Sequence, residues 1–117
     1  MSEQQTDQQV GGPRFAAPLD VLVEGTATPV TVDGVDIALV RDGDDVYAIR
    51  DECSHAAIPL SEGEVEGCEI ECWLHGSRFD VRTGSPLNLP ATEAVPTYPT
   101  TITDGRVLVD VSAPTRS

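Results

Sequence analysis

Two short clusters of cysteine and histidine hold the residues of this chain best suited to chemistry. The first is Cys53-Ser54-His55 and the second is Cys72-Trp73-Leu74-His75-Gly76. Both histidines of the chain lie two or three positions after a cysteine, and residues 56–71 separate the clusters. Thiolate and imidazole bind soft and borderline metals, and a closely spaced pair lets one tight loop present two ligands to one centre. The pattern predicts a metal centre held by Cys53, His55, Cys72 and His75.

The ligand spacing favours an iron–sulfur centre over zinc. Zinc modules usually place two to four residues between paired ligands, whereas only Ser54 separates Cys53 from His55. A cluster with four cysteine ligands is excluded within the chain, which has 3 cysteines. Two cysteines and two histidines form the ligand set of a [2Fe–2S] centre in which histidines replace cysteines on one iron. A zinc-binding structural module stays open on residue types alone.

The elements that must position these loops are predicted to be short antiparallel strands. Residues 19–24 alternate with a period of two, and the dipeptides Asp33-Gly34 and Asp104-Gly105 each predict a hairpin. One face of the strand that follows the first hairpin is expected to carry Val35, Ile37, Leu39 and Arg41. No helical periodicity extends over ten residues, so the predicted fold class is all-β.

The chain predicts one domain with two tails. Residues 1–13 are polar and glutamine-rich and are expected to be a disordered tail, residues 14–112 form the domain, and residues 113–117 form a C-terminal tail. Within the domain, residues 51–90 contain all the cysteines and histidines and have long loops. We expect this segment to be the metal-binding subdomain.

Charge and composition exclude several classes of function. The formal net charge is −13, with 20 acidic and 7 basic residues, so binding to nucleic acid or to an anionic membrane surface is not expected. The N-terminus has no signal-peptide pattern, and no apolar run reaches the length of a membrane span. An odd number of cysteines argues against a secreted disulfide scaffold. We therefore expect a cytoplasmic protein, monomeric in solution.

The two clusters and their flanking residues resemble the Rieske family. The match includes Leu60-Ser61-Glu62-Gly63 after the first cluster, and Ser77-Arg78-Phe79-Asp80 with Thr83-Gly84 after the second. Residues 84–91 resemble the proline-bearing loop that covers the cluster in this family, and the resemblance spans about residues 17–111. It implies a three-sheet antiparallel domain with a cluster-binding subdomain at one tip, holding one [2Fe–2S] cluster per subunit.

Three further positions are expected beside the cluster: Ser77, Phe79 and Pro86. Respiratory Rieske proteins carry a disulfide between their cluster loops, but the corresponding positions here are Ile58 and Leu74. They also carry a tyrosine whose hydroxyl bonds a ligating sulfur, and Phe79 stands at that position. The missing donor and the net charge of −13 both disfavour the reduced state. A reduction potential in the lower part of the Rieske range of about −150 to +300 mV is therefore predicted.

The resemblance implies an electron carrier and no enzymatic activity of its own. A terminal oxygenase needs two further histidines for its mononuclear iron, and a reductase needs a glycine-rich βαβ unit. The predicted function is that of a Rieske ferredoxin passing electrons from a ferredoxin reductase to a terminal non-haem iron oxygenase or another redox protein. Alternatives are a redox subunit similar to the nitrite reductase small subunit, and a ferredoxin serving iron–sulfur cluster assembly.

Four other features of the sequence are not assigned to metal binding or catalysis. Glu62, Glu64, Glu66, Glu69 and Glu71 are either a solvated surface or a docking face for basic partners. Cys68 is expected to be a buried thiol in a turn, and Trp73 is expected to pack within its loop. Asp51 and Asp80 have no histidine left to pair with, so no acid–base role is assigned to them.

Overall fold

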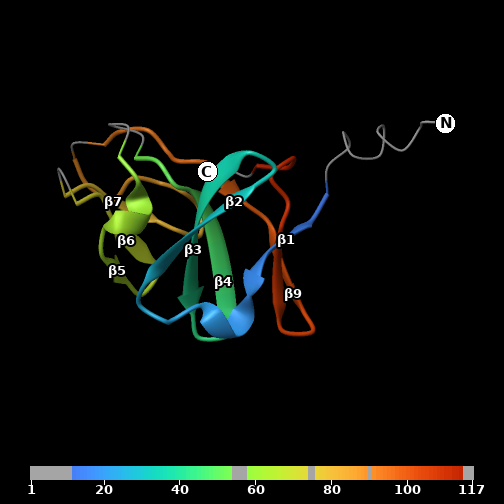
Figure 1. Ribbon diagram of the computed structural model, residues 1–117. Helices are drawn as coiled ribbons and strands as arrows, with labels where there is room; N and C mark the ends of the chain where they lie inside the picture. The colour runs from blue at the N-terminus through green and yellow to red at the C-terminus, as the bar shows by residue number, and fades with distance from the viewer. Residues whose placement is uncertain (1–11, 54–57, 74–75, 90, 115–117) are drawn as a thin grey trace.

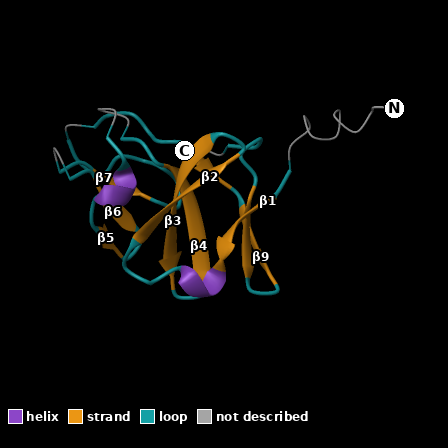
Figure 2. Cartoon of the chain, viewed as in Figure 1, coloured by secondary structure: helices purple, strands orange, loops and turns teal. Residues whose placement is uncertain are grey.

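The computed structural model describes residues 12–53, 58–73, 76–89 and 91–114 (Figures 1 and 2). The predicted ligands His55 and His75 lie outside these residues, as do residues 1–11 and 115–117 of the two predicted tails. The described residues form strands and two 3-10 helices, in the order β1 (Arg14–Pro18), η1 (Leu19–Val21), β2 (Ala27–Val32), β3 (Val35–Asp42), β4 (Asp45–Arg50), η2 (Leu60–Glu62), β5 (Val65–Glu66), β6 (Glu69–Glu71), β7 (Arg78–Asp80), β8 (Thr97–Tyr98), β9 (Thr100–Thr103) and β10 (Arg106–Val109). The predicted all-β class is confirmed.

The strands form three antiparallel sheets, as the family resemblance implied. Their orders are β1-β10-β9, β2-β3-β4-β8 and β5-β6-β7. Figure 1 shows the β5–β6–β7 sheet at one end of the molecule, the four-stranded sheet in the middle, and the sheet of β1, β9 and β10 at the other side. No helix in the described part of the chain has the length and apolarity needed to cross a bilayer.

Both predicted Asp-Gly hairpins are present. Val32 pairs with Val35 around Asp33 and Gly34, whose φ angles are 49° and 82°. Positive φ at both central positions is the geometry of the tight turns that match the twist of paired strands, and Gly and Asp tolerate it better than most residues. Asp104 and Gly105 repeat this geometry between β9 and β10, with φ angles of 53° and 72°.

The predicted strand over residues 19–24 is wrong. A 3-10 turn occupies Leu19–Val21, and the Leu22 amide donates to the Leu19 carbonyl at 3.1 Å. Leu22 is buried, whereas Val21 and Val23 are exposed. Leu19 and Leu22, three positions apart, are the residues of this segment that pack on the core, so burial follows the 3-10 turn and not the alternation of a strand.

The central sheet is buried on both faces. Ile37 and Leu39 pack into one cluster with Val107 and Val109 of β10. The predicted common face of Ile37 and Leu39 is thus confirmed, but the alternate residues of β3, Ala38 and Val40, are equally buried, in a second cluster with residues of the 51–90 segment. The middle sheet therefore serves as a rigid platform against which the two predicted ligand loops are packed.

Candidate metal centre

The first predicted ligand, Cys53, follows the end of β4. The Asp51 amide donates to the Asp36 carbonyl at 2.9 Å. This bond holds the chain to the start of β3 at the point where the chain leaves β4. The Cys53 amide then donates to the Ile58 carbonyl at 2.9 Å, so the loop containing the first cluster closes on itself. Cys53 is only 3% exposed.

A carboxylate clamp fixes the far side of the first loop. Asp51 Oδ1 accepts a hydrogen bond from the Ser61 amide at 2.6 Å, and Asp51 Oδ2 accepts one from the Ser61 hydroxyl at 2.7 Å. These bonds join the residue two positions before Cys53 to helix η2, where Leu60 is fully buried. Asp51 therefore ties the start of the first ligand loop to helix η2.

The second predicted cysteine, Cys72, directly follows β6 and is fully buried. Its amide donates to the Ser77 carbonyl at 2.7 Å, and its carbonyl accepts from the Gly76 amide at 2.8 Å. Gly76 has φ of 76°, a left-handed conformation that glycine adopts without steric cost. The second cluster is thus presented on a loop that is closed at its base by two backbone hydrogen bonds.

The two loops are joined to each other. The Glu71 amide, just before Cys72, donates to the Glu64 carbonyl at 2.8 Å. Gly63 lies so close to the Glu71 carbonyl that a Cβ atom at position 63 would overlap it. Cys53 and Cys72 belong to one buried cluster that also contains Leu60 and Phe79. The structure thus brings the two predicted cysteine ligands into the same part of the core.

A third segment, the proline-bearing loop, packs against the strand that follows the Cys72 loop. Ser77 is fully buried, and its Oγ accepts a hydrogen bond from the Ala91 amide at 3.1 Å. Phe79 is fully buried and forms an antiparallel bridge with Pro86. All three positions expected beside the cluster, Ser77, Phe79 and Pro86, therefore lie in or against the buried wall that carries Cys72.

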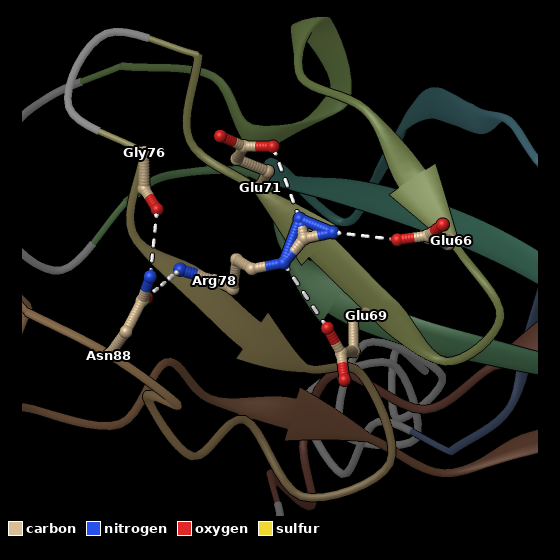
Figure 3. A network of polar contacts seen from close by, with 6 residues as sticks. All are labelled: Glu66, Glu69, Glu71, Gly76, Arg78 and Asn88. Atoms are coloured by element: carbon tan, nitrogen blue, oxygen red, sulfur yellow. Dashed lines mark hydrogen bonds and ion pairs between the residues drawn. The ribbon is translucent and has the colours of Figure 1, made fainter.

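The predicted acidic stretch is largely engaged in an ion-pair network (Figure 3). The Arg78 guanidinium contacts Glu66 at 3.0 Å, and Glu69 and Glu71 at 3.2 Å each. Its side chain is 26% exposed, so these contacts are partly shielded from water. Three of the five glutamates thus share one cation, which leaves the network with a net negative charge, and the Glu66 side chain is 84% exposed.

Large apolar side chains are exposed beside the second cluster. Trp73, which was expected to pack within its loop, is 52% exposed. Leu87 and Leu89 of the proline-bearing loop are 48% and 74% exposed. We call these three exposed apolar residues, Trp73 directly after Cys72 and the two leucines of the proline-bearing loop, the apolar tip.

A second carboxylate interpreted as non-catalytic, Asp80, is also used structurally. Its oxygens accept hydrogen bonds from the Arg82 amide, Nε and guanidinium NH2 group at 2.9 to 3.0 Å. The Arg82 guanidinium holds the pKa of Asp80 below its ordinary value, against the opposing effect of burial. The pair stabilises the turn after β7, where the chain leads into Gly84 and the proline-bearing loop.

Sequence reasoning missed Arg78 and Asn88 as organising residues. Asn88 accepts from the Arg78 amide at 2.6 Å and donates to the Gly76 carbonyl at 3.2 Å. The available signal was a single polar side chain between two leucines, in Pro86-Leu87-Asn88-Leu89. For Arg78, the signal was the one basic residue close to five glutamates.

The described residues fit an iron–sulfur cluster. Two cysteine side chains are buried in one apolar wall, each at the base of a loop closed by backbone hydrogen bonds. Thiolates in dry, closed loops suit a metal that deprotonates them, and apolar surroundings limit water access to such a centre. The sequence adds one histidine to each of these loops.

Comparisons with known proteins agree with this chemistry. Residues 14–99 match the family model described as Rieske [2Fe-2S] domain. The ferredoxin component of the naphthalene 1,2-dioxygenase system of Pseudomonas putida is 42% identical over 97 residues, which cover 83% of this chain and 93% of that protein.

Solved structures agree as well. The ferredoxin of carbazole 1,9a-dioxygenase from Nocardioides aromaticivorans IC177 has a TM-score of 0.81 and 45% identity, covering 83% of this chain and 95% of that one. A chain from a complex of reduced oxygenase and oxidized ferredoxin in carbazole 1,9a-dioxygenase has a TM-score of 0.77 and 34% identity. The match covers 81% of this chain and 98% of that one. From its sequence match, its three-sheet fold and its two buried loop cysteines, the chain belongs to the Rieske [2Fe–2S] domain family.

Proposed function

We propose that this chain is a one-electron carrier, the ferredoxin component that passes electrons from a reductase to a terminal non-haem iron oxygenase. The observation that carries the proposal is the pair of buried cysteines, Cys53 and Cys72, at the bases of two joined loops in a Rieske domain. Relatives that span nearly the same length are named as ferredoxin components of dioxygenase systems. The chain itself performs no chemistry on an organic substrate.

We further propose that Cys53, His55, Cys72 and His75 hold the cluster. When bound, a [2Fe–2S] group of this ligation accepts and releases one electron, at a potential that histidine ligation raises above that of four-cysteine clusters. The buried cysteines exclude water from their side of the site. Ser77 supports this site because its Oγ accepts from Ala91, which leaves the hydroxyl proton for a second acceptor.

The apolar tip of Trp73, Leu87 and Leu89 is the proposed contact for redox partners. Trp73 directly follows Cys72, Leu87 and Leu89 lie in the loop that pairs with β7, and burial of such exposed apolar side chains drives protein association. With Glu66, Glu69 and Glu71 bound to Arg78, apolar contact is expected to contribute more to affinity than the acidic stretch does. We place the protein in the cytoplasm as a monomer, where a cytosolic reductase and oxygenase would be its partners.

Iron and sulfide analysis together with EPR of the reduced protein tests the ligand set. We expect equal iron and acid-labile sulfide, and a signal averaging near g of about 1.9, typical of mixed thiolate and imidazole ligation. Cys53→Ser, Cys72→Ser, His55→Ala and His75→Ala are each expected to abolish that signal. Cys68→Ser is the matched control and should retain it. A colourless protein that binds zinc in place of iron would refute the proposal.

Electron transfer is tested by reconstitution with a reductase and a terminal oxygenase of a naphthalene-type system. Product formation should require the cluster-loaded chain and should fall when Trp73 or Leu89 is replaced by serine. Val23→Ser, which alters an exposed apolar residue in the segment that follows η1, is the matched control. Stable copurification with a large nitrite reductase subunit, without turnover in the reconstituted system, would instead support the alternative of a redox subunit.

A further inference from the structure

The proline-bearing loop pairs with β7 and the residues before it like an irregular additional strand. The Asp80 amide donates to the Ser85 carbonyl at 3.0 Å, and the Leu87 amide donates to the Arg78 carbonyl at 2.7 Å. Between these bonds, Phe79 and Pro86 form a bridge. Up to Leu87, the loop is therefore held by its backbone.

At Asn88, the side-chain amide and not the backbone forms the hydrogen bonds to the neighbouring strand and the residues before it. Its Oδ1 accepts from the Arg78 amide at 2.6 Å, and its Nδ2 donates to the Gly76 carbonyl at 3.2 Å (Figure 3). One amide group thus satisfies an acceptor and a donor that lie two residues apart. A carboxylate cannot make both bonds because it has no donor, and an apolar side chain of the same size makes neither.

Gly76, whose carbonyl accepts from Asn88, closes the second ligand loop together with Ser77. Gly76 donates its amide to the Cys72 carbonyl at 2.8 Å, and Ser77 accepts the Cys72 amide at 2.7 Å. Gly76 also directly follows His75 in the sequence. The position of the Asn88 amide is therefore linked through two backbone hydrogen bonds to Cys72, on the other side of the loop.

The Arg78 side chain adds a second constraint to the same strand. Its guanidinium is bound by glutamates of β5 and β6, while its amide and carbonyl are bound by Asn88 and Leu87. Arg78 is thus fixed from two sides. The Gly76 carbonyl, in contrast, has Asn88 as its side-chain partner. Loss of the Asn88 amide should therefore affect Gly76 more than Arg78.

We propose that Asn88 is a positioning residue that fixes the second ligand loop against the proline-bearing loop, and thereby sets the ligand geometry and reduction potential of the cluster. The proposal rests on the ligand set of the proposed function. Because a histidine-ligated iron responds to the orientation of its ligands, a loosened loop should alter the spectrum and potential as well as stability. A purely structural residue far from the centre would change stability alone.

The test compares Asn88→Leu and Asn88→Asp with the wild-type, cluster-loaded protein. For Asn88→Leu we expect roughly tenfold faster cluster loss to a chelator, equivalent to about 1.4 kcal/mol, because two hydrogen bonds are lost. We also expect shifted EPR g values, a shifted midpoint potential and faster hydrogen exchange in the 76–79 peptide. Asn88→Asp keeps an acceptor for Arg78 and should give intermediate exchange in that peptide.

The control is Thr26→Val, which removes a 2.7 Å side-chain bond to the Val23 carbonyl in a remote turn. It should leave g values, potential and the 76–79 exchange unchanged. If Asn88→Leu retains wild-type g values and potential, the inference is overturned even where stability falls. A wild-type protein that holds no cluster would instead overturn the proposed function, so the two failures are distinguishable. If Asn88→Leu fails to fold, Asn88→Asp decides by the same readouts.

Discussion

The Cys68 thiol donates a hydrogen bond to the Asp42 carboxylate, with 3.1 Å between Sγ and Oδ2. Burial raises the pKa of Cys68 above its ordinary value, and the bond to Asp42 raises it further because the carboxylate favours the protonated thiol. Cys68 is half-buried and lies in the turn between β5 and β6, which corrects the expectation of a buried thiol. Cys68 packs against the hydrophobic cluster that contains Cys53 and Cys72, the two proposed ligands, but it is less buried than either of them.

Asp42→Asn is expected to lower the pKa of Cys68 and speed its alkylation. The thiolate is the reactive form, so a raised pKa means that wild-type Cys68 reacts more slowly near pH 8 than an ordinary exposed cysteine. Iodoacetamide labelling of the cluster-loaded protein across pH 7 to 10, with peptide mapping, measures this rate. Asp44→Asn, in the same turn, is the control. Equal rates for wild type and Asp42→Asn would contradict the prediction.

Asp51→Ala is expected to destabilise the cluster-loaded protein by about 1.5–3 kcal/mol, because hydrogen bonds to a charged group are lost from a partly buried clamp. Ser61→Ala removes only the hydroxyl bond of 2.7 Å and should cost less. Thermal unfolding followed by visible absorption and circular dichroism measures both changes. Glu52→Ala is the control because its contact to Arg50, at 3.6 Å, is exposed on both sides. Similar losses for Glu52→Ala and Asp51→Ala would exclude a specific clamp.

The Asp80–Arg82 pair predicts a stability difference that depends on pH. Because the folded-state pKa of Asp80 is lowered, chiefly by the Arg82 hydrogen bonds, the pair stabilises the fold above the unfolded-state pKa of about 3.9. That contribution is lost as the pH falls through the lower folded-state pKa. Arg82→Gln should therefore be less stable than wild type near pH 6, with the gap narrowing below about pH 4. Denaturation midpoints from pH 2.5 to 7 measure the gap, and a gap that stays constant down to pH 2.5 would exclude this linkage.

Local chemistry explains which features could be predicted from the sequence. The Asp33-Gly34 hairpin and the Cys53 and Cys72 loops depend on neighbouring residues, so short motifs identify them. The Asp42–Cys68 bond joins residues 26 positions apart, and Asn88 contacts residues 10 and 12 positions away. The first pair forms where the end of β3 meets the β5–β6 turn and the second where a loop lies along β7, and neither partner carries a local signal of the other.

Phe79→Tyr is expected to raise the reduction potential, because a new hydroxyl donor near the cluster would stabilise the added negative charge. The structure places Phe79 in the buried cluster that contains both cysteines, with Ile70 as its Cα partner across the sheet. Redox titration monitored by circular dichroism measures the potential. Phe15→Tyr is the matched control because Phe15 is exposed on β1, in the other terminal sheet. An unchanged potential in Phe79→Tyr would mean that the hydroxyl finds another partner.

Three glycine-to-alanine variants separate backbone strain from close packing around the metal centre. At Gly105, φ is 72° and a Cβ meets nothing within 4 Å, so alanine should cost about 1–2 kcal/mol of strain alone. At Gly63, a Cβ would overlap the Glu71 carbonyl, and alanine should cost about 1–3 kcal/mol because the two ligand loops must separate.

At Gly84 both effects combine, because φ is 81° and a Cβ would overlap the Val95 carbonyl, so the largest loss is expected there. Chemical denaturation ranks the three stabilities, and cluster release to a chelator gives an independent ranking. Gly63→Ala and Gly84→Ala should accelerate release because they displace loops that pack around Cys72, whereas Gly105→Ala lies in the distant β9–β10 turn and should not. Faster release in Gly105→Ala than in Gly63→Ala would show that global stability, and not the contact between the ligand loops, controls retention of the cluster.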